Sequence, residues 1–140
     1  MTLQVSFYSD AAEPLHFACR LVRRALASGK PVGVCAEPAA LARLDALLWS
    51  FDAAEFLPHR RWVTGEPHLP GEVLLVSDAS QLPHRGLLVN LSHDLPTAAF
   101  EFERVLEVVS ADDEAVRAGR VRYRAYQQVQ ARLDHFSARG

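Results

Sequence analysis

The chain has 140 residues, of which 49% are hydrophobic and 23% are charged, and its formal net charge is −2. This balance excludes an intrinsically disordered chain and gives no global attraction to nucleic acid. We expect one domain over residues 1–140, because a chain of this length buries about two-thirds of its unfolded surface without disulfides or metals.

The first half of the chain alternates strand and helix signals. Apolar residues alternate with polar ones over 3–7, which predicts a strand. Asp10–Glu13 is a candidate capping box for a helix that has Pro14 in its first turn and ends at Gly29. The apolar run Pro31–Ala36 then predicts a buried strand.

A second helix is predicted from Pro38 to about Trp49, and turn-forming residues predict a surface loop over Arg60–Glu72. The remaining predicted elements are short buried strands at Val73–Val76 and Leu87–Leu91, a short helix at Pro96–Phe102, a strand at Val105–Val109 and a last helix, capped within Ser110–Asp113, to about Phe136. This alternation predicts a single-domain α/β three-layer sandwich with a mostly parallel sheet flanked by helices.

Targeting and cofactor signals are missing from the sequence. The N-terminus has no basic region followed by an apolar run, and no stretch approaches the ~20 apolar residues that span a bilayer. Cys19, Cys35 and the six histidines lack metal-ligand spacing. We therefore expect a cytoplasmic protein with free thiols, no metal and no cofactor.

Enzymatic interpretations find little support. Gly29–Lys30 ends a predicted helix and precedes a strand, whereas a phosphate-binding loop follows a strand and opens a helix. The fold should thus resemble a nucleotide-binding fold without a phosphate loop. Ser77, Asp78 and His84 lack the nucleophile elbow of a hydrolase. The order of strands and helices also resembles the second motor domain of superfamily 2 helicases, so a degenerate helicase-like or nucleotide-binding domain stays an alternative.

Two blocks of sequence resemble one known family. Leu44–Trp49 followed by Glu55–His59, and later Arg120–Tyr126, occur in the same order as in the chi subunit family of bacterial DNA polymerase III. Ser28–Val32 is a weaker match. The resemblance implies a non-catalytic accessory subunit of the clamp-loader complex that acts in DNA replication as a protein–protein adaptor.

The resemblance also implies a binding site for the acidic C-terminal tail of single-stranded-DNA-binding protein, which ends in Asp-Ile-Pro-Phe. Arg120 and Tyr123 match family residues that bind this tail, and Val109 matches an apolar position of the pocket for the phenylalanine. Where the family has a lysine one turn before the arginine, this chain has Val116. Arg117 is a candidate substitute, although it points about 100° further round the helix.

The last predicted helix is basic, because five arginines and no acid lie between Ala115 and Leu133. Arg117 and Arg124 flank the face of Arg120 and Tyr123, and the residues expected to pack on the sheet are Ala115, Ala118, Val121 and Ala125. A second alternative follows: these arginines, with Tyr123 and Tyr126, would bind single-stranded nucleic acid directly. The acidic net charge makes us expect that any DNA contact is indirect or weak.

A second partner surface is implied around the end of the second helix. Trp49, Phe56 and Pro58 match the family surface that receives the psi subunit, or a helicase-like partner competing for it, and psi would connect the chain indirectly to the clamp loader. Large aromatic residues are more often core than surface. The residues alone therefore leave both placements open.

Overall fold

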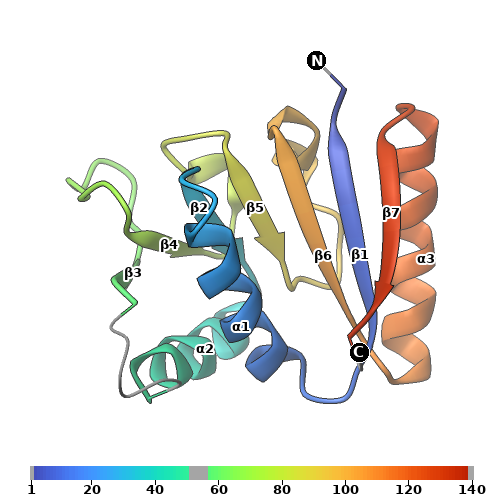
Figure 1. Ribbon diagram of the computed structural model, residues 1–140, viewed down its shortest axis with the longest axis horizontal. Coiled ribbons are helices and arrows are strands. Elements are labelled where there is room, and N and C mark those ends of the chain that lie inside the picture. Colours follow the sequence, from blue (N-terminus) through green and yellow to red (C-terminus); the bar gives the residue numbers. More distant parts are fainter. Residues whose placement is uncertain (1, 51–56, 139–140) are drawn as a thin grey trace.

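The computed structural model describes residues 2–50 and 57–138. Strands and helices alternate along this part of the chain, as predicted (Figure 1). In order they are β1 (Gln4–Ala11), α1 (Pro14–Leu26), β2 (Val32–Cys35), α2 (Pro38–Ser50), β3 (His59–Arg61), β4 (Val73–Val76), the 3₁₀ helix η1 (Ala79–Gln81), β5 (Leu87–Asn90), the 3₁₀ helix η2 (Thr97–Glu101), β6 (Arg104–Ser110), α3 (Asp113–Gln128) and β7 (Arg132–Ser137).

The strands of the described residues form one seven-stranded sheet in the order β3-β4-β2-β5-β6-β1-β7. Every neighbouring pair in this order runs parallel. Helices α1 and α2 cover one face, whereas α3 lies behind β1 and β7 on the other (Figure 1). The predicted α/β sandwich with a parallel sheet is confirmed.

Two hydrophobic clusters fill the spaces on either side of the sheet. One contains the inner faces of α1 and α2, and the other contains η1, η2 and residues of α3. All residues of β2, β4 and β5 are buried, which explains why these strands are continuous apolar runs. None of the helices within residues 2–50 and 57–138 is both long and apolar enough to cross a membrane.

The predicted capping box at Asp10–Glu13 is wrong. Strand β1 continues to Ala11, with Asp10 in the left-handed region at φ 61°, and Glu13 is the residue that precedes α1. The sheet pairing of β1 with β6 reaches Ala11, so Asp10 and Ala11, which a capping box would use, belong to the end of this strand. Gly29 does end the turn after α1, at φ 82°.

The last helix is shorter than predicted. It ends at Gln128, Gln130 takes φ 59°, and the chain returns as strand β7 beside β1. The Arg132 amide donates to the Leu3 carbonyl at 2.8 Å. Pairing with an otherwise unoccupied strand edge overrides the helical pattern that we extended to Phe136, because it satisfies a row of backbone groups on both strands.

The predicted surface loop over Arg60–Glu72 contains a strand and a buried side chain. Strand β3 includes Arg60 and Arg61, and the Trp62 side chain is 8% exposed and donates from Nε1 to the Gln81 carbonyl at 3.0 Å. Residues 63–71 are exposed, as expected. The sequence pattern did not indicate β3, because this strand is short and is followed at once by many turn-forming residues.

Candidate functional site

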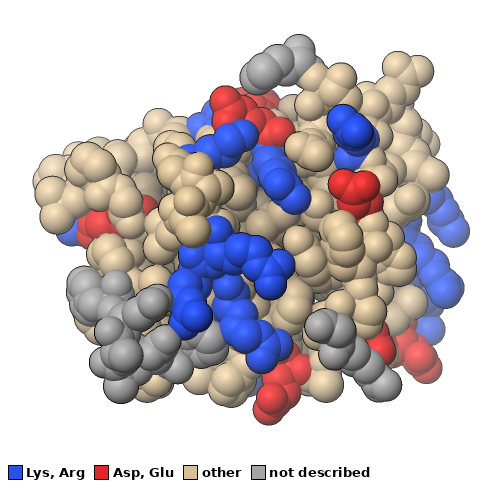
Figure 2. Space-filling model, viewed as in Figure 1, with Lys and Arg blue, Asp and Glu red and all other residues tan. Residues whose placement is uncertain are grey.

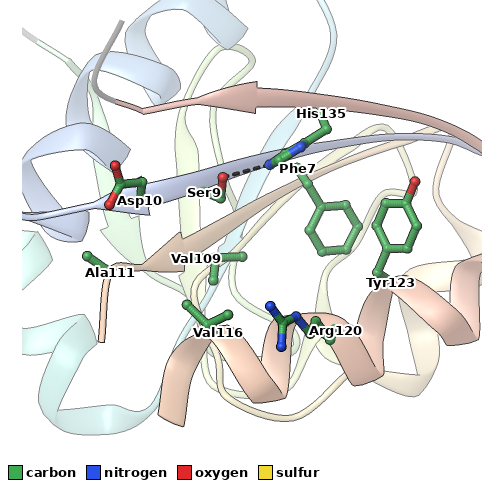
Figure 3. Close-up of a pocket in the computed structure, with 10 residues that line it drawn as sticks. Phe7, Ser9, Asp10, Val109, Ala111, Val116, Arg120, Tyr123 and His135 are labelled. Atoms are coloured by element: carbon green, nitrogen blue, oxygen red, sulfur yellow. Dashed lines mark hydrogen bonds between the residues drawn. The ribbon is translucent and has the colours of Figure 1, made fainter. Parts of the chain in front are cut away.

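A pocket of about 400 Å³ lies between α3 and the strands β1, β6 and β7 (Figure 3). It is at the carboxyl ends of β1 and β6, from which the chain continues into helices on opposite faces of the sheet. Such a switch point is where parallel sheets usually bind ligands. The lining residues are Phe7, Ser9, Asp10, Val109, Ala111, Val116, Gly119, Arg120, Tyr123 and His135.

Four of the six residues predicted for the tail site line this pocket. Arg120 and Tyr123 come from α3, Val116 lies one turn before Arg120, and Val109 comes from β6. Figure 3 shows the guanidinium of Arg120 between the side chains of Val116 and Tyr123. The structure therefore brings these four side chains together around one cavity.

Arg117 and Arg124 are not among the residues that line the pocket. Both are exposed on α3, whereas Val116 takes the position that faces the cavity one turn before Arg120. The helix geometry thus turns Arg117 away, as its offset of about 100° predicts.

The floor of the pocket is aromatic and apolar. The rings of Phe7 and Tyr123 meet edge to face, with centroids 5.1 Å apart, and Val109 is 6% exposed beside them. Polar groups stand at its rim: the Ser9 hydroxyl and His135 Nε2 are 2.6 Å apart, and Arg120 is exposed. An apolar floor beside a guanidinium suits a ligand that has an apolar group close to an anion.

Gly119 sets how closely α3 approaches the sheet. A Cβ atom at this position would lie 3.1 Å from both Cγ atoms of Val109. Glycine inside a helix costs about 1 kcal/mol relative to alanine. Sequence reasoning missed this residue, although a glycine in a helical pattern is itself a signal of close packing.

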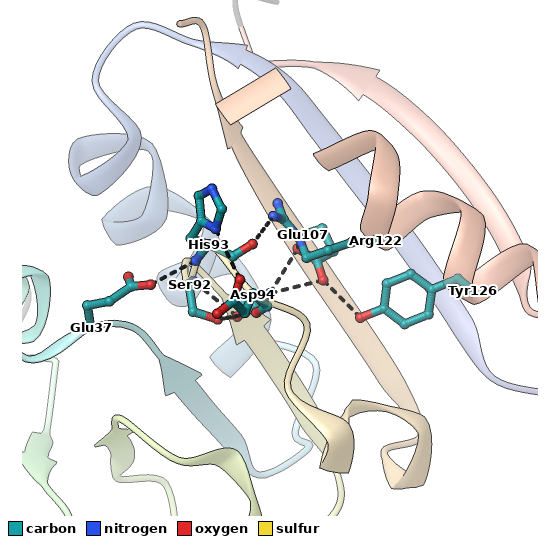
Figure 4. A network of polar contacts seen from close by, with 8 residues as sticks. Glu37, Ser92, His93, Asp94, Glu107, Arg122 and Tyr126 are labelled. Atoms are coloured by element: carbon teal, nitrogen blue, oxygen red, sulfur yellow. Dashed lines mark hydrogen bonds and ion pairs between the residues drawn. The ribbon is translucent and has the colours of Figure 1, made fainter. Parts of the chain in front are cut away.

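Next to the pocket, a buried polar network joins α3 to the sheet (Figure 4). Glu107, which is 0% exposed, accepts hydrogen bonds from Arg122 Nε at 2.9 Å, Tyr126 Oη at 2.8 Å and Asn90 Nδ2 at 3.0 Å. Arg122 Nη1 also donates to the His93 carbonyl at 2.7 Å. The network holds α3 in a defined rotation against β5 and β6, and this rotation presents Arg120 and Tyr123 to the pocket.

Burial dominates the electrostatics of this network. It raises the pKa of Glu107, although the charge of Arg122 and the hydrogen bonds of Asn90 and Tyr126 act in the opposite direction. Burial, followed by the charge of Glu107, raises the pKa of Tyr126. The network therefore keeps the Tyr126 hydroxyl protonated as a donor to Glu107.

The predicted packing face of α3 is correct only in part. Ala115, Ala118 and Ala125 are half-buried, but Val121 is 63% exposed. The buried residues of this helix are Gly119, Arg122 and Tyr126. Apolar spacing misled the prediction, because a buried ion pair with Glu107 allows an arginine to face the sheet. Tyr126 is 0% exposed, so the predicted nucleic-acid surface combining it with Tyr123 is not formed.

The second predicted surface is described in part. The Trp49 side chain is 59% exposed at the end of α2, and Pro58 is half-buried before β3. The Trp49 ring lies 4.5 Å, centroid to centroid, from the buried ring of His59, whose Nε2 is 2.9 Å from Asp45 Oδ1. Phe56 lies outside the described residues. Trp49 therefore lies on the surface and not in the core.

The residues considered for enzymatic chemistry have structural partners. Lys30 follows the turn at Gly29 and lies 3.4 Å from Glu103. Asp78 caps η1, accepting from the Ser80 amide at 3.0 Å. His84 Nδ1 accepts from the Gly86 amide at 3.1 Å. Lys30, Asp78 and His84 therefore each take part in a local structural contact.

The sequence is similar to known proteins over most of its length. The profile of the family described as "DNA polymerase III chi subunit, HolC" matches residues 1–134. The chain is 33% identical over 130 residues to DNA polymerase III subunit chi of Pseudomonas aeruginosa, a match covering 89% of each protein. It is 32% identical over 111 residues to DNA polymerase III subunit chi of Haemophilus influenzae, covering 76% of this chain and 75% of that relative. The matched region of the family profile includes α3 and the strands β1 and β6 of the pocket.

Proposed function

The chain belongs to the DNA polymerase III chi subunit family, and from this premise we propose that it is a non-catalytic adaptor that holds the tail of single-stranded-DNA-binding protein in the pocket beside α3. Family membership gives it an accessory role in DNA replication. The observation that carries the tail proposal is the position of Arg120 at the rim of an apolar pocket lined by Phe7, Val109 and Tyr123.

The chemistry of the tail fits the pocket. A terminal phenylalanine supplies an aromatic ring for the floor formed by Phe7 and Val109. Its α-carboxylate belongs to the same residue, so the negative charge is close to the ring. Arg120 can donate two parallel hydrogen bonds to such a carboxylate. Capture of a C-terminal carboxylate together with an apolar side chain is a recurring mode of peptide recognition.

Val116 changes what the upstream acidic residues of the tail meet. An apolar side chain lines the pocket one turn before Arg120, so the cationic contact expected at this position in the family is replaced by an apolar one. The aspartates of the tail would then lie nearer to the solvent, where charge pairs contribute about 0–1 kcal/mol. We infer that this site depends more on the terminal phenylalanine and carboxylate than on the acidic run.

The second proposed face is the surface of the exposed Trp49 and the half-buried Pro58, and it would receive psi. Phe56 is assigned to this face from the family resemblance. A large exposed aromatic ring is the usual anchor of a protein–protein interface. Two linked contacts raise the local concentration of the polymerase machinery on the coated template. This tethering role requires no active site.

The test is calorimetric titration of the protein with a peptide ending in Asp-Asp-Asp-Ile-Pro-Phe. We expect saturable one-to-one binding, which Arg120→Ala reduces at least about tenfold because a charge-assisted contact is lost. The control is Arg61→Ala, which removes an exposed arginine from β3 at the other edge of the sheet.

A peptide with an amidated C-terminus separates the carboxylate from the acidic run. It should bind the wild-type protein weakly, and Arg120→Ala should make little further difference to it. Equal binding of the acid and the amide, or no binding by a folded wild-type protein, would contradict the proposal.

A further inference from the structure

The face of the sheet opposite α3 is exposed over β7, at Arg132, Asp134 and Phe136, whereas Ser6 and Tyr8 of β1 are buried on this face. Helix α1 lies on this side, and within the described residues no helix lies over β1 and β7 there (Figure 1). Strand register places alternate side chains on this face: Tyr8 of β1 lies beside Phe136 of β7, and Gln4 beside Arg104 of β6. The tail pocket is on the opposite face, so this surface is separate from it.

A continuous row of aromatic rings crosses this open face from α1 to β7. The centroid of Phe17 lies 5.4 Å from that of Tyr8, and Tyr8 stacks on Phe136 at 5.4 Å with 24° between the ring planes. Phe136 is 48% exposed. At the β7 end of the row, the Phe136 ring is therefore stacked on Tyr8 and is still accessible to solvent.

Arginines border the row. The Cζ of Arg20 lies over the Phe17 ring, 5.6 Å from its centroid, and Arg24 follows Arg20 by one helical turn. Arg23 is exposed as well, and no acidic residue lies among residues 14–26. Arg104 projects from β6 onto the same face, where its Nη2 donates to the Ser6 hydroxyl at 3.1 Å. Figure 2 shows basic side chains gathered over α1 and the neighbouring strands.

We propose that this face binds single-stranded nucleic acid, with Arg20, Arg24 and Arg104 on the phosphates and a base stacked on Phe136. Arginines at an interval of four residues lie about 5–6 Å apart at their Cβ atoms, so one strand of phosphates can contact both Arg20 and Arg24. Aromatic platforms beside cationic grooves are the usual means of binding unpaired bases without sequence preference.

An acidic group on this face limits the affinity. Asp134 projects between Arg132 and Phe136, because alternate residues of β7 share a face. With a net charge of −2 for the whole chain, the contact should be weak and sensitive to salt. An acidic polypeptide without aromatic side chains offers charge but no ring to stack on Phe136, so the exposed ring favours nucleic acid over such a polypeptide.

The test is fluorescence anisotropy of a labelled oligothymidylate at several salt concentrations, beginning at low ionic strength. We expect Arg20→Gln with Arg24→Gln to lower the affinity about tenfold or more, and to reduce the slope of log K against log salt by about 1.4, since each lost phosphate contact removes about 0.7. Phe136→Leu should lower the affinity about tenfold through lost stacking.

The charge-matched comparison is Arg117→Gln with Arg124→Gln, two exposed arginines of α3 on the other side of the sheet. It should have the smaller effect, and thermal unfolding should show that all variants are folded. The proposal is overturned by equal losses in both double variants, by absence of binding to the wild type at low salt, or by polyglutamate competing as well as oligothymidylate while Phe136→Leu changes nothing.

Discussion

Arg120 and Arg122 are two positions apart in α3, yet their guanidinium groups have opposite surroundings. Arg120 is exposed at the rim of the pocket, whereas Arg122 is 4% exposed and paired with Glu107. The same division applies to Tyr123 and Tyr126, of which Tyr123 lines the pocket and Tyr126 donates to Glu107. One short motif therefore supplies both the candidate site and the network that orients it.

The network should be the most sensitive point of the core. Glu107→Gln would leave the buried charge of Arg122 without its counter-ion, which typically costs about 3–5 kcal/mol in the free energy of unfolding. Tyr126→Phe removes one hydrogen bond to a charged group and should cost about 2 kcal/mol. Urea denaturation of both variants checks the order, and a smaller loss for Glu107→Gln than for Tyr126→Phe would contradict it.

At the scale of elements, the edge strand β7 decides the shape of the candidate site. It pairs with β1 over its whole length and contributes His135 to the pocket and Phe136 to the open face. The amides of Arg132 and Ala138 donate to carbonyls of the β1 segment. Since alternate residues of a parallel strand bond to the same neighbour, the Asp134 amide also points toward β1.

A proline at position 134 tests this pairing. Asp134→Pro removes the amide donor and should lower the free energy of unfolding by roughly 1–2 kcal/mol, the net contribution of a ladder hydrogen bond and its geometry. Asp134→Ala keeps the amide and is the matched control. Chemical denaturation should separate the two variants, and equal stabilities would mean that β7 contributes little to the sheet.

At the scale of the whole molecule, the two candidate partner surfaces lie at opposite ends of the sheet. Helix α2 packs on β3, the strand at one edge, and α3 packs on β7 at the other. Partners on the Trp49 surface and in the Arg120 pocket therefore do not compete for the same residues. Simultaneous binding of two partners is what a tethering protein requires.

Replacing Trp49 tests both its exposure and the independence of the two surfaces. In Trp49→Phe the buried Trp62 is the remaining tryptophan, so fluorescence emission should shift to shorter wavelength and become less accessible to iodide. Affinity for the tail peptide should stay within about twofold, because distant sites act additively. Unchanged emission, or a large loss of peptide affinity, would contradict this separation.

The local sequence by itself determined the order of strands and helices through most of the chain. Continuous apolar runs at residues 73–76 and 87–90 can be buried on both faces in a parallel sheet, and Gly29 and Pro38 mark helix boundaries. The Leu44–His59 and Arg120–Tyr126 blocks, in the same order as in the family, together indicated the family to which the chain belongs. These features depend on neighbours along the chain.

Tertiary structure alone decided the end of α3, the existence of β7 and the rotation of the helix. Each depends on a partner in a different element: β1 for the edge strand, Glu107 for Arg122, and Val109 for Gly119. A buried charge is tolerated where an opposite charge meets it, and a strand forms where an open edge offers hydrogen bonds. Spacing along the sequence carries neither kind of information. Four residues of the pocket could therefore be predicted from the sequence, but the shape of the pocket could not.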